Sequence, residues 1–205
     1  MKNDSPVASK SPVKYGHLRW SRHIFDITLK NETMKEIFFE LNQMFENTNG
    51  LDHYIEQLEE AHKNEKTIVG IGAGRMGYSL RAHIMRLSHI GFDTYFIGDT
   101  STPRIGPNSL VVINSSSGET PTNVLFAKQA KEAGSVLITI TCNKDSTIGM
   151  MSDIVVQIPI LNSHQLMKSI YEQYSLLLFD YASECLVSKM NLDRDKIIYN
   201  HSILE

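Results

Sequence analysis

Two polar turns rich in glycine and serine contain the residues of this chain whose types and spacing could do chemistry. The first covers residues 70–77 (GIGAGRMG) and the second residues 114–120 (NSSSGET). Each follows a short apolar, β-branched run and precedes a stretch with helical character. Such a turn directs backbone N–H groups and hydroxyls to one place, with the positive end of a helix dipole behind them. The pattern predicts an anion site, and phosphate is the anion that it favours.

The second turn is the more specific of the two. Four side-chain hydroxyls lie within six residues and come from Ser115, Ser116, Ser117 and Thr120. Pro121 follows at a position typical of the first residue of a helix. This density of hydroxyls suits a phosphate cradle, whereas the plain alternative is a polar turn that only caps its helix.

The first turn also matches the G-x-G-x-x-G fingerprint of dinucleotide-binding folds, through Gly72, Gly74 and Gly77. Asp93 and Asp99 lie where an acid that binds the ribose would be expected. A dinucleotide site, however, needs one pyrophosphate cradle and an open crevice for the adenosine, and the second turn would crowd that crevice. We therefore rank an NAD-dependent oxidoreductase below a protein that binds a small phosphorylated ligand.

The composition of the 205 residues is ordinary for a soluble globular protein, with 41% hydrophobic and 21% charged residues. A formal net charge of −3 gives no electrostatic footprint for nucleic acid. Cys142 and Cys185 lack metal-ligand spacing, so we expect neither a metal centre nor a disulfide framework. Without a long apolar span or a leader-like segment, we expect a cytoplasmic protein that does not enter a membrane.

The pattern along the chain predicts an α/β fold in one domain over residues 18–205, preceded by a polar, disordered extension over residues 1–17. Strand-like runs are expected at 66–71, 93–98, 109–114, 135–140 and 153–158. Helical patterns are expected at 18–46, 50–63, 76–90, 121–133, 146–151 and 163–189, with a shorter one after Asp193. This alternation is typical of a parallel sheet with right-handed crossovers. The centre of the long helix (174–182, YSLLLFDYA) is apolar on too many sides for one sheet face, which favours a subunit interface.

Several segments together resemble one known family. They are residues 72–75 (GAGR), 85–92 (MRLSHIGF), 98–100 (GDT), 115–120 (SSSGET) and 201–205 (HSILE). The chain is similar to the sugar isomerase (SIS) domain family over about residues 30–205, and most similar to its 6-phospho-3-hexuloisomerase branch. The serine turn is the family's strongest motif, and the Gly-Ala-Gly-Arg turn and the ending narrow the choice to that branch.

The resemblance implies a five-stranded parallel sheet of flavodoxin-like order, flanked by helices and assembled as a homotetramer with active sites between subunits. It implies a phosphosugar isomerase of the ribulose monophosphate pathway that interconverts D-arabino-hex-3-ulose 6-phosphate and fructose 6-phosphate through an enediolate. The sugar phosphate would lie over the carboxyl ends of the strands. Its phosphate ligands map onto Ser115, Ser116, Ser117 and Thr120, and no metal or organic cofactor is expected.

The resemblance also nominates the groups that would move protons. Glu172 would be the base, with Leu176 and Phe179 on the same face of its helix, whereas the plain alternative is a hydrated surface glutamate. His201 would assist proton transfer at a hydroxyl or ring opening, although a histidine near the end of a chain is more often simply exposed.

Three further residues of the two turns are candidates for substrate binding. Gly74 and Arg75 would approach the sugar phosphate, with Arg75 holding the phosphate or polarising an enediolate oxygen, unless it only forms a salt bridge across the turn. Glu119 would orient Arg75 or contact a sugar hydroxyl, or else be a favourable charge in the first turn of a helix.

The chain departs from the family pattern at two positions. Relatives commonly have a serine where this chain has Met76, and often have an arginine where it has Asn200. Both changes bear on the identity of the sugar rather than on the fold. The alternatives are therefore a SIS module that binds a sugar phosphate as a regulator without chemistry, and an aldose–ketose isomerase of a different phosphosugar.

Overall fold

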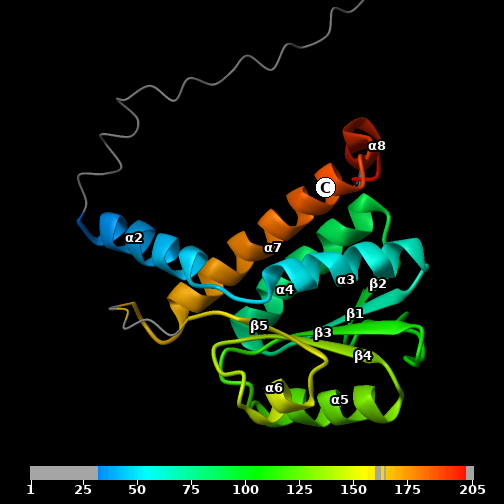
Figure 1. Cartoon of the computed structure of the whole chain (residues 1–205), viewed down its shortest axis with the longest axis horizontal. Coiled ribbons are helices and arrows are strands. Elements are labelled where there is room, and N and C mark those ends of the chain that lie inside the picture. Colours follow the sequence, from blue (N-terminus) through cyan, green and yellow to red (C-terminus); the bar gives the residue numbers. More distant parts are fainter. Residues whose placement is uncertain (1–31, 160–162, 164, 202–205) are drawn as a thin grey trace, which may run out of the picture. The chain divides into compact units, whose positions relative to one another are not determined.

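Five parallel strands form one sheet in the computed structural model, which describes residues 32–159, 163 and 165–201 (Figure 1). The strands are β1 (Thr67–Gly72), β2 (Thr94–Phe96), β3 (Ser109–Asn114), β4 (Val136–Thr141) and β5 (Ile154–Gln157). Their order across the sheet is β2-β1-β3-β4-β5, and every neighbouring pair is parallel. This is the flavodoxin-like order, so the predicted fold class is confirmed.

Helices alternate with these strands along the chain. They are α2 (Glu32–Glu46), α3 (Leu51–Lys63), α4 (Gly74–Ile90), α5 (Pro121–Glu132), α6 (Thr147–Met151), α7 (Ser169–Lys189) and α8 (Arg194–Tyr199). Figure 1 shows α3, α4 and α7 on one side of the sheet and α5 and α6 on the other. Each face of the sheet is thus covered, which is the usual arrangement for parallel strands.

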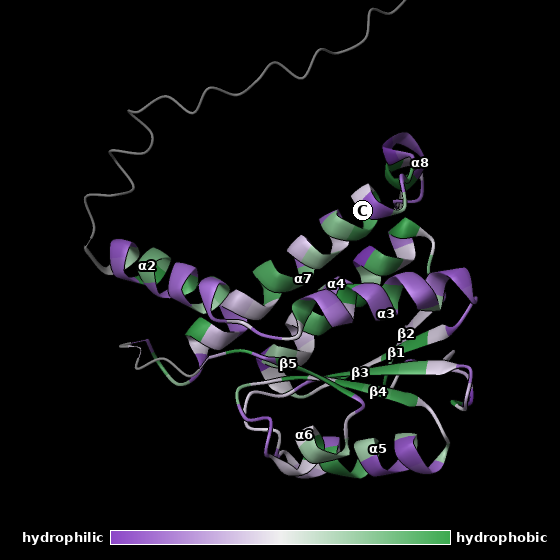
Figure 2. Ribbon diagram, in the orientation of Figure 1, coloured by the Kyte–Doolittle hydropathy of each residue, from purple (hydrophilic) through white to green (hydrophobic). Residues whose placement is uncertain are grey.

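The central strand β3 contributes side chains to the hydrophobic cores on both faces of the sheet. Leu110 and Val112 belong to the core that packs under α3, α4 and α7, whereas Val111 and Ile113 belong to the core under α5 and α6. Successive side chains of a strand point to opposite faces, so an unbroken apolar run serves both cores. Figure 2 shows the resulting hydrophobic strands between helices that carry both hydrophilic and hydrophobic residues.

The long helix α7 carries more apolar surface than its own layer can bury. Tyr174, Phe179 and Leu186 are buried against the sheet side, yet Leu177 and Tyr181 remain 51% and 44% exposed. The predicted apolar excess of this helix is therefore visible in the structure as an exposed patch.

Three predicted boundaries differ from the structure for local reasons. The strand predicted over 93–98 ends at Phe96, whose N–H donates to the Asp99 carboxylate at 3.1 Å in a tight turn. The helix predicted from residue 163 begins at Ser169, after Met167 adopts a left-handed φ of 55° that interrupts a helix. The helix predicted from residue 76 already begins at Gly74.

Internal contacts divide the chain into two units, residues 1–36 and 37–205, and the sheet with the helices on both of its faces belongs to the second. The extension predicted over residues 1–17, and the part of the helix predicted over 18–31, lie outside the described residues. Within the part of the chain that the structure describes, no helix is long and apolar enough to cross a membrane.

Candidate functional site

The first glycine-rich turn brings the end of β1 against the start of α4. Gly72 and Gly77 approach so closely that a Cβ on Gly77 would lie 2.5 Å from the Gly72 carbonyl oxygen. Gly74, the first residue of α4, has a φ of 58°, which suits a residue without a Cβ. The G-x-G-x-x-G spacing therefore has a structural cause in this chain, namely close strand–helix packing, without any dinucleotide.

The serine turn joins the carboxyl end of β3 to α5, next to the end of β4. The Ser115 N–H donates to the Ile140 carbonyl at 3.0 Å, and the Gly118 N–H donates to the Ser115 carbonyl at 3.1 Å. A side chain at Gly118 would collide with Ser146, because a Cβ there would lie 1.9 Å from the Ser146 Oγ. The turn is thus fixed on the sheet edge where parallel α/β folds bind ligands.

The four hydroxyls of this turn do not share one environment. The Ser115 and Thr120 oxygens lie 3.5 Å apart, whereas the buried Ser116 hydroxyl lies 3.5 Å from the Cys142 sulfur. Ser117 is exposed, and its Oγ accepts the Glu119 N–H at 3.2 Å. Ser117 is therefore exposed and Thr120 half-buried, whereas Ser115 and Ser116 are both buried, Ser115 beside Thr120 and Ser116 beside Cys142.

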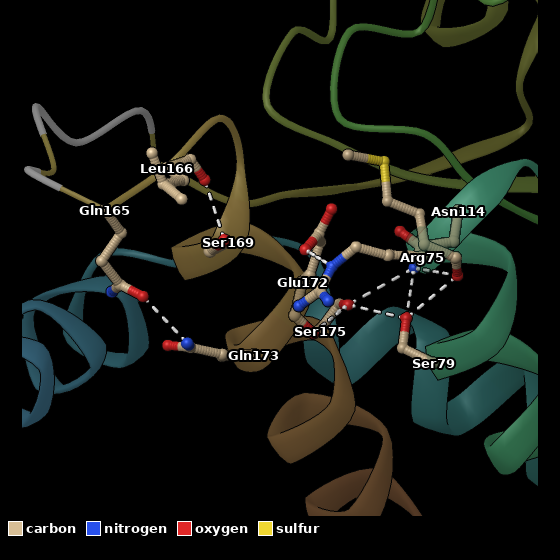
Figure 3. A network of polar contacts seen from close by, with 10 residues as sticks. Arg75, Ser79, Asn114, Gln165, Leu166, Ser169, Glu172, Gln173 and Ser175 are labelled. Carbon is tan, nitrogen blue, oxygen red and sulfur yellow. Dashed lines mark hydrogen bonds and ion pairs between the residues drawn. The ribbon is translucent and has the colours of Figure 1, made fainter.

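A buried side-chain amide, that of Asn114, ties β3 to α4 and α7 (Figure 3). Its Nδ2 group donates to the Met76 carbonyl and the Ser79 hydroxyl at 3.0 Å each, and to the Ser175 hydroxyl at 3.4 Å. Its Oδ1 accepts the Tyr171 hydroxyl at 2.7 Å. One residue at the end of the strand thus fixes the first turns of both helices.

The same network holds the backbone around Glu172. The Tyr171 hydroxyl also donates to the Ile140 carbonyl at 3.0 Å, the same carbonyl that accepts the Ser115 N–H. The Ser175 hydroxyl donates to the Glu172 carbonyl at 3.0 Å. Burial raises the pKa of Tyr171, so its hydroxyl stays protonated and acts as a donor. The start of α7 and the serine turn are therefore positioned by a shared set of hydrogen bonds.

Glu172 and Arg75 form an ion pair and both line an open pocket of about 330 Å³. The Arg75 Nε donates to Glu172 Oε2, and Figure 3 shows the two side chains pointing toward one another. The Glu172 side chain is only 13% exposed, whereas Arg75 is 68% exposed. A largely buried carboxylate beside an exposed cation can serve acid–base chemistry on a charged ligand. The pocket is lined by Arg75, Tyr78, Ser79, Ala82, Glu172, Gln173 and Leu176.

Glu119 contacts Thr147, so the structure does not show the first of the roles considered for it, the orientation of Arg75. Its carboxylate accepts the backbone N–H and the hydroxyl of Thr147, both at 2.7 Å. The bond from the Thr147 N–H, followed by that from the hydroxyl, lowers the pKa of Glu119. Glu119 therefore fastens the start of α6 to the serine turn, and Arg75 is oriented by Glu172 instead.

The structure does not bring His201 to Glu172 within one chain. The ring of His201 lies 5.1 Å from that of His89, near the end of α4, whereas Arg75 is at the start of this helix. The separation of fourteen positions between Arg75 and His89 corresponds to roughly 21 Å of helix. A role for His201 at the pocket therefore requires a second copy of the chain.

Sequence reasoning did not single out the network residues that position the site. Tyr171 and Ser175 are four residues apart and so lie on one face of α7, and Ser79 faces them from α4. Polar residues at this spacing on the apolar face of a helix could have indicated the network, because a buried polar side chain needs a hydrogen-bond partner. Within the described ranges, no group of three or more His, Cys, Asp or Glu side chains could hold a metal ion.

Comparison with known families identifies the class of this protein. The SIS domain model matches residues 53–180, which include both turns and Glu172. The chain therefore belongs to the SIS domain family.

Particular relatives make the likeness more specific. A 3-hexulose-6-phosphate isomerase of Bacillus subtilis is 31% identical, with 73% of this chain and 86% of the relative covered. A protein of the same name from Methanocaldococcus jannaschii is 32% identical, with 75% and 83% covered. A crystal structure of a Methanococcus jannaschii protein, from which a 3-hexulose-6-phosphate isomerase function was inferred, has a TM-score of 0.76 at 27% identity. The structural match covers 85% of this chain and 100% of that protein.

Proposed function

We propose that this protein is a phosphosugar isomerase that interconverts D-arabino-hex-3-ulose 6-phosphate and fructose 6-phosphate. The observation that carries the proposal is the largely buried Glu172 carboxylate, paired with exposed Arg75 beside an open pocket. Family membership and the named relatives support the same substrate class.

The reaction moves one carbon-bound proton between neighbouring carbons. Glu172 removes the proton from C2 of the 3-keto sugar, and the released electron pair forms the C2–C3 double bond of a cis-enediolate. Negative charge develops on the oxygen at C3, where the Arg75 guanidinium stabilises it. The hydroxyl proton at C2 moves to the oxygen at C3, and protonated Glu172 returns its proton to C3, which leaves the 2-keto sugar.

The phosphate would be bound by the serine turn. The hydroxyls of Ser115, Ser117 and Thr120 lie around the N-terminus of α5, where Thr120 is the N-cap and makes no side-chain cap bond. The unpaired N–H groups of a first helical turn and the positive helix dipole favour an anion there. Gly74, at the start of α4, leaves the backbone of the first turn open to the same ligand, since a Cβ there would meet no atom within 4 Å.

His201 would reach the site from a second copy of the chain. It is exposed and lies at the opposite end of α4 from Arg75. The exposed apolar residues Leu177 and Tyr181 on α7 offer a surface for such an assembly, which we propose to be a homotetramer. His201 would then transfer protons at the sugar hydroxyls or assist ring opening.

The decisive experiment separates proton transfer from binding. Glu172→Gln keeps the size of the side chain but cannot accept a proton from carbon, so turnover should fall at least about 100-fold while fructose 6-phosphate still binds. Solvent deuterium incorporation into fructose 6-phosphate should fall in parallel. Glu184→Gln is the matched control, because Glu184 is an exposed glutamate near the other end of α7. Near-normal exchange in Glu172→Gln would contradict the proposed role.

Binding is tested separately at the serine turn. Ser117→Ala and Ser115→Ala should each weaken fructose 6-phosphate binding by about 1–2 kcal/mol per lost hydrogen bond, with little change in melting temperature. Unchanged affinity in both would remove the turn from the site. Binding of sugar phosphates without any turnover would instead identify a regulatory SIS module, and turnover of an aldose phosphate alone would identify an isomerase of a different sugar.

A further inference from the structure

Ser116 differs from its neighbours in the serine turn because sulfur atoms face both its backbone N–H and its hydroxyl. Its backbone N–H donates to the Met76 sulfur at 3.4 Å. Its hydroxyl lies 3.5 Å from the Cys142 sulfur, and its carbonyl accepts the Cys142 N–H at 3.0 Å and the Thr141 hydroxyl at 3.2 Å. The N–H is the donor that matters for an anion, and in this chain a thioether occupies it.

Met76 is held where it can cover this donor. It is the third residue of α4, and its carbonyl accepts from the Asn114 amide at 3.0 Å and from the Ser79 hydroxyl at 2.9 Å. The backbone is thus fixed by the network, while the half-buried side chain packs against the core and extends to the second turn. Met76 is therefore the side chain that links the two anion-binding turns.

A thioether is a replaceable partner for an amide. Sulfur is a weak acceptor, and the methionine side chain has three rotatable bonds, so the sulfur can move away from the amide at little cost in free energy. A phosphate oxygen is a charged acceptor and forms a stronger bond with the same N–H. An anion that reaches Ser116 would have to displace the Met76 sulfur first.

We infer that Met76 masks the Ser116 amide and thereby weakens anion binding at the serine turn. This inference rests on the proposed phosphosugar site. While the sulfur stays in place, the anion is limited to the hydroxyls of Ser115, Ser117 and Thr120 and to the start of α5. Removing the sulfur adds one backbone donor to that set.

The test compares Met76→Ala and Met76→Leu with the wild-type chain by calorimetric titration with inorganic phosphate and with fructose 6-phosphate. Met76→Ala exposes the amide and should bind both about threefold to tenfold more tightly, the effect of one added hydrogen bond. Met76→Leu keeps the bulk but removes the acceptor, and should tighten binding by a smaller factor. Met150→Ala is the control, because Met150 is a methionine that is 73% exposed, and it should leave both affinities unchanged.

The outcomes separate this inference from the proposed function. Tighter binding in the Met76 variants supports the masking role even if no variant isomerises a sugar. Binding that is absent in the wild-type chain and present in the Met76 variants supports it as well. Equal affinity for wild type and both variants, or no binding in any of them, would overturn it. Should Met76→Ala fail to fold, the nearly isosteric Met76→Leu decides the result alone.

Discussion

Replacing Asn114 by alanine tests whether one buried amide holds the site together. The change removes the donor to Ser79, Ser175 and the Met76 carbonyl, and the acceptor for the Tyr171 hydroxyl. Ser79 and Ser175 keep each other as partners at 2.9 Å. The Met76 carbonyl keeps the Ser79 hydroxyl at 2.9 Å, and the Tyr171 hydroxyl keeps the Ile140 carbonyl at 3.0 Å. Each lost hydrogen bond removes about 0.5–1.5 kcal/mol, and the volume that the side chain vacates adds to this cost. We expect the free energy of unfolding to fall by about 2–4 kcal/mol.

The assay is equilibrium urea unfolding followed by far-UV circular dichroism, with every variant at the same protein concentration. Asn108→Ala is the matched control, because exposed Asn108 immediately precedes the other end of β3 and should cost less than about 0.5 kcal/mol. Tyr171→Phe should cost about 1–3 kcal/mol, and the double variant less than the sum, because both changes break one shared bond. The reasoning is refuted if Asn114→Ala unfolds like its control.

Two further predictions concern assembly and pH. Light scattering should give several times the chain mass of 23.2 kDa, most consistent with a tetramer. Leu177→Glu on the exposed face of α7 should reduce the measured mass. A fully active monomer of the unaltered chain would contradict the proposed assembly. Burial lowers the pKa of His83 to about 3, and its ring bonds to the hydroxyls of Tyr54 and Ser183 at 2.8 and 3.3 Å. The unfolded chain binds a proton at this ring more readily than the folded chain does. The contribution of neutral His83 to the free energy of unfolding is therefore complete above about pH 6.5 and is lost toward pH 3, at about 1.4 kcal/mol per pH unit. Urea titrations at pH 7, 6 and 5 should show this loss and His83→Gln should flatten it, whereas parallel slopes would exclude His83 as the cause.

Much of the fold could be predicted from the sequence because its signals are local. The uninterrupted apolar run of β3 indicates a strand buried on both faces, and the glycine and serine turns mark where strands end. Met167 shows the limit of this reasoning, since its left-handed backbone ends the helical pattern and nothing in the periodicity indicates it. The resemblance supplied the strand order, which alternation alone leaves open.

The candidate site was predicted in its parts but not in its pairings. The two turns could be named from motifs and Glu172 from the resemblance, and the structure places Glu172 beside Arg75. The sequence left several roles open for Glu119, because a charge at the start of a helix has several neighbours within reach and only the position of α6 selects Thr147. His201 was nominated as a site residue, but the sequence did not indicate how far it lies from Arg75, because that distance depends on the position of α8.

The sequence by itself determined the order of strands and helices along the chain, the two glycine- and serine-rich turns and the apolar excess of α7. These follow from residue type and short-range spacing, which fix backbone conformation and the faces that must be buried. Only the tertiary structure decided that Arg75 pairs with Glu172, 97 positions away, and that the Met76 sulfur occupies the Ser116 amide, 40 positions away. Such contacts arise because the sheet edge gathers the ends of distant strands and helices, and no pattern within a single segment specifies which side chains then meet.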